Sequence, residues 1–216
     1  MLKAVFFDLD GTLADTAPDL AHALNRLRSL HQLPALPTST IRPYASQGAR
    51  GMLKVGFDLD PEQDNFNDMR DLFLAFYAER LCADTRLFPG IPELLAEIEK
   101  RNLPWGVITN KLQRFTVPLL QQLDLYERAA CIVSGDNVPK PKPDPASLLY
   151  ASKEVGVSPA DCIYVGDDKR DVEAGHAAGM RVIVANYGYL GIGNDPATWQ
   201  ADGMINEPLE TLNYLH

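Results

Sequence analysis

Short apolar runs alternate with longer amphipathic stretches through most of this 216-residue chain. The runs are rich in β-branched and aromatic residues, and they predict buried strands at residues 3–7, 105–110, 131–135, 162–168 and 181–186. Helical patterns lie between the later runs, at residues 91–102, 114–125, 144–156 and 170–179. Strands that alternate with helices form a parallel sheet covered on both faces. We therefore predict an α/β protein with a doubly wound, Rossmann-like parallel sheet.

The segment between the first two predicted strands breaks this alternation. It contains helical patterns, at residues 18–30 and 66–81 for example, but no convincing strand. Pro89 and Gly90 mark the return to the alternating pattern. We therefore expect a small helical domain at residues 16–85, inserted after the first strand. The core domain is then made of residues 1–15 and 86–216, a size that suits one hydrophobic core with a smaller appendage.

Charge and cysteine content narrow the range of partners and compartments. Asp and Glu outnumber Lys and Arg by 29 to 20, so the chain as a whole repels nucleic acid and anionic membranes, and neither is expected as a partner. Three cysteines without a CxxC pair suit buried thiols in a reducing compartment. The first residues do not resemble a signal peptide, and no stretch approaches the roughly 20 apolar residues of a membrane span. We expect a cytoplasmic protein.

The tetrapeptide Phe-Asp-Leu-Asp occurs twice, at residues 7–10 and 57–60. The first copy follows a predicted strand and precedes Gly11, so it lies at the carboxyl end of that strand, where ligands bind in open α/β sheets. Side chains two apart on a strand share a face, so Asp8 and Asp10 point toward one site if the extended backbone continues.

The second copy has a structural interpretation. Asp60 precedes Pro61, and these residue types suit the N-cap and the first position of a helix. The copy also lies in the segment without strands. We therefore predict that it starts a helix and is not part of an active site.

Polar side chains also follow the later predicted strands. They are Thr109 and Asn110, Lys140 and Lys142, and Asp167, Asp168 and Asp171. Because the carboxyl ends of parallel strands meet at one edge of the sheet, these groups are expected to share a site with Asp8. Crowded carboxylates favour a hard divalent cation, with Mg²⁺ the usual choice. A metal, a lysine and a hydroxyl donor together suit a phosphoryl group.

In their order along the chain, "DLDGT", "TN", "KPDP" and "GDDKRD" resemble the four motifs of the haloacid dehalogenase superfamily, and the resemblance spans essentially the whole chain. It implies that Asp8 is the nucleophile that takes the phosphoryl group as an aspartyl-phosphate. Asp10 would protonate the leaving group and then activate water, and Thr109 would bind the phosphoryl oxygens. Asp8, the backbone carbonyl of Asp10 and Asp167 would hold Mg²⁺.

The resemblance leaves several roles open. Lys142 would neutralise Asp8 and the phosphoryl group, with Lys140 as its competitor. Asp171 would be a second acidic partner of the metal or would orient Lys142. Asp168 departs from the pattern, because many relatives carry serine there, and the extra acid leaves open which carboxylates touch the metal.

The helical insertion resembles the cap domain of phosphoglycolate phosphatase-like members, which closes over the substrate. "SQGARGM" at residues 46–52 is the candidate cap loop that contacts substrate. Gly48 permits close backbone approach, and Arg50 can bind a carboxylate or phosphate. The alternative is an ordinary helix N-terminus with a solvated arginine.

The expected function is a Mg²⁺-dependent phosphatase that acts on a small phosphorylated metabolite. Further stretches such as "NYGYLG" resemble the subgroup that acts on N-acetylmuramic acid 6-phosphate, whose catalytic motifs are shared with phosphoglycolate phosphatases. A sugar phosphomutase of the β-phosphoglucomutase type has the same motifs and stays open as an alternative. A non-catalytic binding module is disfavoured because no catalytic group is missing. We expect a monomer or a homodimer.

Overall fold

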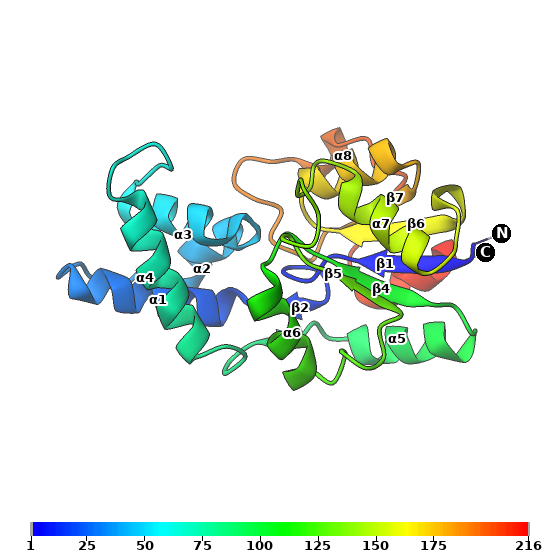
Figure 1. Ribbon diagram of the computed structural model, residues 1–216, viewed down its shortest axis with the longest axis horizontal. Helices are drawn as coiled ribbons and strands as arrows, with labels where there is room; N and C mark the ends of the chain where they lie inside the picture. The colour runs from blue at the N-terminus through cyan, green and yellow to red at the C-terminus, as the bar shows by residue number, and fades with distance from the viewer. Residues whose placement is uncertain (1, 216) are drawn as a thin grey trace.

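The structure is a computed structural model that describes residues 2–215, and its centre is a six-stranded parallel sheet (Figure 1). The strands are β1 (Ala4–Phe7), β4 (Trp105–Ile108), β5 (Cys131–Val133), β6 (Cys162–Gly166), β7 (Arg181–Ala185) and β8 (Gly203–Ile205). Their order is β5-β4-β1-β6-β7-β8, and every neighbouring pair is parallel. The predicted doubly wound α/β fold is confirmed. Of the six strands of this sheet, only the edge strand β8 was not predicted; its residues, Gly-Met-Ile, do not form a run of β-branched and aromatic residues.

Helices cover both faces of the sheet, as Figure 1 shows. One face packs against α5 (Ile91–Lys100) and α6 (Gln113–Gln122), and the other packs against α7 (Ala146–Glu154) and α8 (Lys169–Ala178). Successive side chains of a strand point to opposite faces, so β1 supplies both clusters and is buried at every position. A strand buried on both sides is apolar throughout, which explains the continuous run "AVFF".

The central position of β1 determines which residues meet at the carboxyl edge. Phe7 is in register with Val107 of β4 on one side and with Val165 of β6 on the other. The residues that follow these three strands therefore lie side by side. They include Asp8 after β1 and Thr109 after β4.

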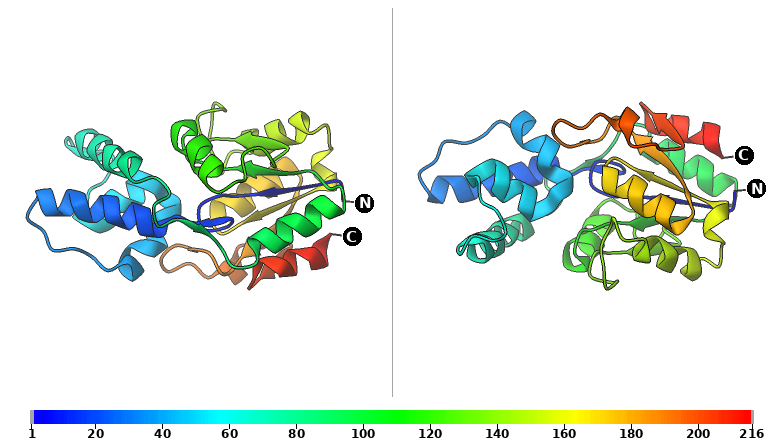
Figure 2. Two further views of the ribbon diagram at one scale, coloured as in Figure 1. Left: turned by 90° about the horizontal axis from the view of Figure 1, so that it is seen from below. Right: turned by 90° about the horizontal axis from the view of Figure 1, so that it is seen from above.

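The helical insertion projects from this edge (Figure 2). It consists of α1 (Ala17–Leu30), α2 (Thr38–Ile41), the 3₁₀ helix η1 (Arg42–Gln47), α3 (Gly48–Phe57) and α4 (Phe66–Glu79). A two-stranded antiparallel sheet, β2 (Ala14–Asp15) and β3 (Arg86–Leu87), joins the two chain crossings between the insertion and the core. This small sheet was not predicted, because pairs of two residues carry no pattern. Within residues 2–215, no helix is both long and apolar enough to cross a bilayer.

The second Phe-Asp-Leu-Asp copy ends a helix, and the prediction that Asp60 and Pro61 start one is wrong. Asp58 adopts the left-handed conformation (φ 52°, ψ 36°) at the end of α3, and α4 begins only at Phe66. Aspartate tolerates this conformation better than most residues do, so it can end the helix before Asp60 is reached. Lys54 pairs with the carboxylates of Asp58 and Asp60, at 2.7 and 2.9 Å.

Two further expectations need correction. "SQGARGM" is not a loop, because Ser46 and Gln47 close η1 and residues 48–52 form the first turns of α3. Its two glycines favoured the prediction of a loop, but the segment enters a helix whose buried face includes Met52. All three cysteines are free thiols, but only Cys162 is buried, and Cys82 and Cys131 are partly exposed.

Candidate active site

Acidic side chains converge where β1 and β6 end. Asp8 follows β1, Asp167 follows β6, and Asp171 lies in the first turn of α8. One carboxylate oxygen from each of the three lies within 4.8 Å of the others, and all three residues are buried. The structure therefore brings together three of the acids that the sequence singled out.

Gly11 is required for this convergence. It turns the chain after Asp10 with a φ of +90°, a conformation that strains other residues. A Cβ at this position would lie 2.2 Å from Asp167 Oδ2, so the turn and the carboxylate pack directly against each other. The turn leaves Asp10 lining the same pocket as Asp8, with Thr16 Oγ1 donating a hydrogen bond to Asp10 Oδ1.

Lys142 is the cation at the centre of this cluster. Its Nζ lies 2.9 Å from Asp8 Oδ1 and 2.7 Å from Asp171 Oδ1, and it donates to the Tyr164 hydroxyl at 2.6 Å. Burial by itself lowers the pKa of Lys142, but Asp171 and Asp8 outweigh burial and raise it. Lys140 is exposed, and its nearest carboxylate is that of Asp144 at 3.9 Å. The structure thus brings Lys142 and not Lys140 to Asp8.

Asn110 positions the backbone of Lys142. Its Nδ2 donates to the Lys142 carbonyl and its Oδ1 accepts from the Lys142 N–H, both at 2.9 Å. Thr109 is buried beside it and lines the same pocket, where its Oγ1 accepts from the Lys111 N–H at 3.1 Å. The residues after β4 therefore hold the lysine that follows β5.

The buried carboxyl groups have unusual protonation equilibria. Burial raises the pKa of Asp8 to about 7, against the opposing effect of Lys142 and with a smaller contribution from Asp171. Burial and the charge of Asp8 raise the pKa of Asp167 well above its usual value. Such shifts favour protonated carboxyl groups at a pH where ordinary aspartates are ionised, unless a positive charge besides that of Lys142 joins them.

The donor set suits a divalent cation. Asp8 Oδ1 is buried and accepts no well-aligned hydrogen bond from residues 2–215, apart from its ion-pair contact with Lys142. Asp171 has both oxygens engaged, one by Lys142 and one by the Asp168 N–H at 3.0 Å. Hard oxygen ligands with an unsatisfied buried member fit Mg²⁺ better than a softer metal. Asp8, Asp167 and Asp171 are the side chains whose oxygens lie close enough together to hold it.

The carboxylate of Asp168 bonds to the N-terminus of α8 and to the side chain of Arg170. It caps the helix by accepting from the Arg170 N–H at 2.9 Å, and its two oxygens pair with the Arg170 guanidinium at 2.9 and 2.8 Å. Burial by itself raises the pKa of Asp168, but Arg170 holds it below its usual value. The extra acid of "GDDKRD" thus has an arginine as its partner.

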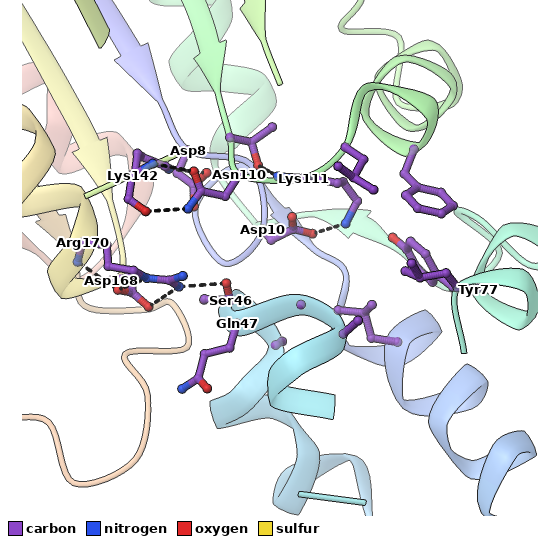
Figure 3. Close-up of a pocket in the computed structure, with 18 of the residues that line it drawn as sticks. Asp8, Asp10, Ser46, Gln47, Tyr77, Asn110, Lys111, Lys142, Asp168 and Arg170 are labelled. Atoms are coloured by element: carbon purple, nitrogen blue, oxygen red, sulfur yellow. Dashed lines mark hydrogen bonds and ion pairs between the residues drawn. The ribbon is translucent and has the colours of Figure 1, made fainter. Parts of the chain in front are cut away.

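These groups open into a pocket of about 260 Å³ between the sheet edge and the helical insertion (Figure 3). Gly48 lines it, but Arg50 is exposed and does not. The observed position of Arg50 is that of a solvated arginine near the start of a helix, the alternative stated for it. Ser46 and Gln47, which belong to the predicted substrate-contacting segment "SQGARGM", also line the pocket. The pocket residues that were not predicted from the sequence include Arg70, Tyr77, Lys111 and Arg170.

Lys111 is the closest of these residues to the predicted chemistry. Its Nζ lies 2.8 Å from Asp10 Oδ1 and 4.9 Å from the centre of the Tyr77 ring, which belongs to α4 (Figure 3). Lys111 could have been identified from the sequence as a site residue, because it directly follows the Thr-Asn pair at a strand end. Tyr77 could not, since an aromatic residue within a helical pattern predicts core packing.

A doubly wound sheet with buried acids and a lysine at its carboxyl edge defines the protein as an α/β enzyme of the phosphoryl-transfer kind. The family model for haloacid dehalogenase-like hydrolases matches residues 5–185. The chain therefore belongs to the haloacid dehalogenase-like hydrolase family.

Individual relatives are named as phosphatases. An N-acetylmuramic acid 6-phosphate phosphatase of Pseudomonas putida is 45% identical to this chain, and the alignment covers 97% of this chain and 94% of the relative. A phosphoglycolate phosphatase of Xanthomonas campestris pv. campestris is 39% identical, and the alignment covers 95% of this chain and 93% of the relative. The crystal structure of a predicted phosphoglycolate phosphatase from Haemophilus somnus has a TM-score of 0.88 at 27% identity and covers 100% of this chain and 98% of that one. The expected class of enzyme, a phosphatase, is confirmed.

Proposed function

We propose that the protein hydrolyses a small phosphorylated metabolite through an aspartyl-phosphate on Asp8, with Mg²⁺ bound. The observation that carries the proposal is Asp8 itself. It is buried at the end of the central strand, lies 2.9 Å from Lys142 Nζ, and lines a pocket large enough for a small metabolite. Such a carboxylate, once ionised, is a nucleophile for phosphorus.

The other side chains divide the remaining work. Asp8 attacks the phosphorus, and Lys142 and Thr109 compensate the charge on the phosphoryl oxygens. Asp10 gives its proton to the oxygen of the departing alcohol, and then takes a proton from the water that hydrolyses the aspartyl-phosphate. Asp171 Oδ1 accepts a hydrogen bond from Lys142 Nζ at 2.7 Å, which supports a role in orienting Lys142.

Asp8, Asp167 and the backbone carbonyl of Asp10 are the proposed ligands of Mg²⁺. The ion supplies charge neutralisation that lets Asp8 and the substrate phosphate approach each other. The raised pKa values of Asp8 and Asp167 support this assignment, because buried acids of this kind need a positive charge in order to ionise together.

We further propose that residues 16–85 act as a cap domain over a core made of residues 1–15 and 86–216. The proposal is supported by the pocket, which is lined on one side by the sheet edge and on the other by α1, η1, α3 and α4. A cap in this position excludes bulk water while the aspartyl-phosphate forms. A cytoplasmic location, supported by three free thiols, and a monomeric or homodimeric state belong to the same proposal.

The names of the relatives support two substrates, N-acetylmuramic acid 6-phosphate and 2-phosphoglycolate. Each carries a phosphate and a carboxylate. The test measures phosphate release from both compounds and from simple hexose phosphates, as kcat/KM, with Asp8→Asn as the control. We expect one of the two carboxylate-bearing compounds to be the best substrate and Asp8→Asn to lose at least about a thousandfold in kcat. Isomerised sugar phosphate without free phosphate would show a phosphomutase instead.

A further inference from the structure

Arg170 has no part in the mechanism above, yet it lines the pocket with Asp8 and Lys142. Figure 3 shows Arg170 and Asp168 on one wall, with Ser46 of the helical insertion beside them and the Asp10–Lys111 pair on the opposite side. The guanidinium is therefore separate from the lysine that faces the phosphoryl position but opens into the same cavity.

The guanidinium of Arg170 is held from two sides. Asp168 accepts from Nε at 2.9 Å and from Nη2 at 2.8 Å, and the backbone carbonyl of Ser46 accepts from Nη2 at 2.9 Å. Paired bonds of this type fix the plane of an arginine as well as its charge. The remaining nitrogen, Nη1, has no hydrogen-bond acceptor among residues 2–215, and about a third of the side chain stays exposed. A fixed arginine thus offers free donors to the pocket.

The other cations of the pocket are less suited to a second anionic group. Lys142 and Lys111 are almost fully buried and are bound to Asp8 and Asp10. Arg70 of α4 pairs only with the exposed carboxylate of its neighbour Asp71, and an exposed pair of this kind fixes a side chain weakly. Arg170 is the only arginine of this pocket that the described residues hold in place.

We propose that Arg170 is the specificity-determining residue that binds the carboxylate of the substrate, with Asp168 and Ser46 as its positioning partners. The inference rests on the proposed function, since it assigns the second anionic group of the same substrate. Asp168 orients an arginine toward the substrate, and the free Nη1 donors then meet the carboxylate without reorganisation.

The test uses two pairs of compounds in each of which only one member carries a carboxylate, as part of a lactyl ether in the first pair and in place of a methyl group in the second. N-acetylmuramic acid 6-phosphate is compared with N-acetylglucosamine 6-phosphate, and 2-phosphoglycolate with ethyl phosphate. For each pair, the preference is the ratio of the two kcat/KM values. We expect the unmodified enzyme to prefer the carboxylate-bearing member of the pair it hydrolyses. Arg170→Gln is expected to lower that preference roughly 10- to 100-fold, through KM for the carboxylate-bearing compound.

Arg70→Gln is the matched control and is expected to keep the preference. Arg170→Lys is expected to give an intermediate preference, because lysine keeps the charge but lacks the planar guanidinium that binds a carboxylate through two N–H groups. If Arg170→Gln does not fold, as judged by urea unfolding, Arg170→Lys carries the comparison. An unmodified enzyme without preference, an unchanged preference in both Arg170 variants, or an equal loss in Arg70→Gln overturns the inference. Failure of the unmodified enzyme to release phosphate from any of the four compounds overturns the proposed function instead.

Discussion

Lys142 balances the buried charges of the site. Its ammonium group is almost inaccessible and lies within 3 Å of carboxylate oxygens of both Asp8 and Asp171. Charges buried at such short range interact much more strongly than exposed ones, and removal of one partner leaves the others without compensation. The stability of the protein is therefore expected to depend on a residue for which we propose a catalytic role.

Lys142→Met is expected to lower the free energy of unfolding by about 3 kcal/mol at pH 8, because it leaves two buried carboxylates without their cation. The loss should be smaller at pH 6, where Asp8, with a pKa of about 7, takes up a proton and needs no cation. Urea unfolding at both pH values in the presence of a chelator measures the effect. Lys140→Met is the matched control, since Lys140 is exposed, and it should leave the unfolding curve unchanged. Equal curves for the two variants would contradict the central role of Lys142.

Magnesium binding is expected to strengthen as the pH rises from 6 to 8. Asp8 has a pKa raised to about 7 and Asp167 has a pKa raised well above its usual value, so below pH 7 protons compete with the metal. If one proton is displaced, affinity falls about tenfold for each pH unit below 7. Calorimetric titration of Mg²⁺ at several pH values tests this, and Asp8→Asn should show a weaker pH dependence. Affinity that does not change with pH would exclude Asp8 as a titrating ligand.

At the scale of elements, the end of α3 shows how the same letters take different structures. At residues 7–10, Phe-Asp-Leu-Asp lies where a strand ends, and at residues 57–60 it lies where a helix ends. Asp8 directly follows a strand that lies between two parallel neighbours, whereas Asp58 ends a helix in the left-handed conformation. The pairing partners that distinguish the two copies are distant in the sequence.

Asp58→Gly is expected to stabilise the protein modestly, because glycine adopts the left-handed conformation at the end of α3 without steric cost. The ion pair that it removes, with Lys54, is exposed and contributes little. A higher urea midpoint than that of the parent chain is the expected result. Asp60→Gly is the control, because it removes the other acid paired with Lys54 without changing the helix end. A midpoint for Asp58→Gly at or below the parent value would contradict this account.

The core strands and the long helices were largely predictable from the sequence, whereas β8 and the two-residue strands β2 and β3 were not. Buried strands show as continuous apolar runs, as "AVFF" does for β1, and long helices show an apolar period. Asp8, Thr109, Lys142 and Asp167 could be named because each follows such a strand. Arg170 and Tyr77 could not, because their contacts with Ser46 and Lys111 depend on how the insertion packs on the core. Tertiary contacts of this kind leave no local pattern.

For the molecule as a whole, Tyr189 connects the core to the helical insertion. It follows β7, and its hydroxyl accepts from the N–H groups of Thr16 and Ala17, at 2.8 and 3.0 Å, where the chain enters α1. The same hydroxyl donates to Asp15 Oδ1 at 3.0 Å. One side chain of the core thus determines how the first linker of the insertion lies.

Tyr189→Phe keeps the ring but leaves the buried N–H groups of Thr16 and Ala17 without an acceptor, which should cost about 1–3 kcal/mol of unfolding free energy. Amide hydrogen exchange at these two positions should become faster, and urea unfolding should give the size of the loss. Tyr187→Phe is the comparison, because within residues 2–215 the Tyr187 hydroxyl makes one hydrogen bond, which it donates to the Thr12 carbonyl. Unchanged exchange at residues 16 and 17 would show that Tyr189 does not hold the linker.

The glycines around the acidic cluster have a consequence for anyone who transplants this site into another scaffold. A Cβ at Gly11 or Gly188 would lie 2.2 Å from Asp167 Oδ2 or 2.3 Å from Asp167 Cβ, and a Cβ at Gly166 would lie 2.4 Å from Asp171 Cγ. Each acid therefore occupies the space of a missing side chain. A designer who grafts only the charged residues would build carboxylates that cannot fit, so the acids and their glycines have to be moved as pairs.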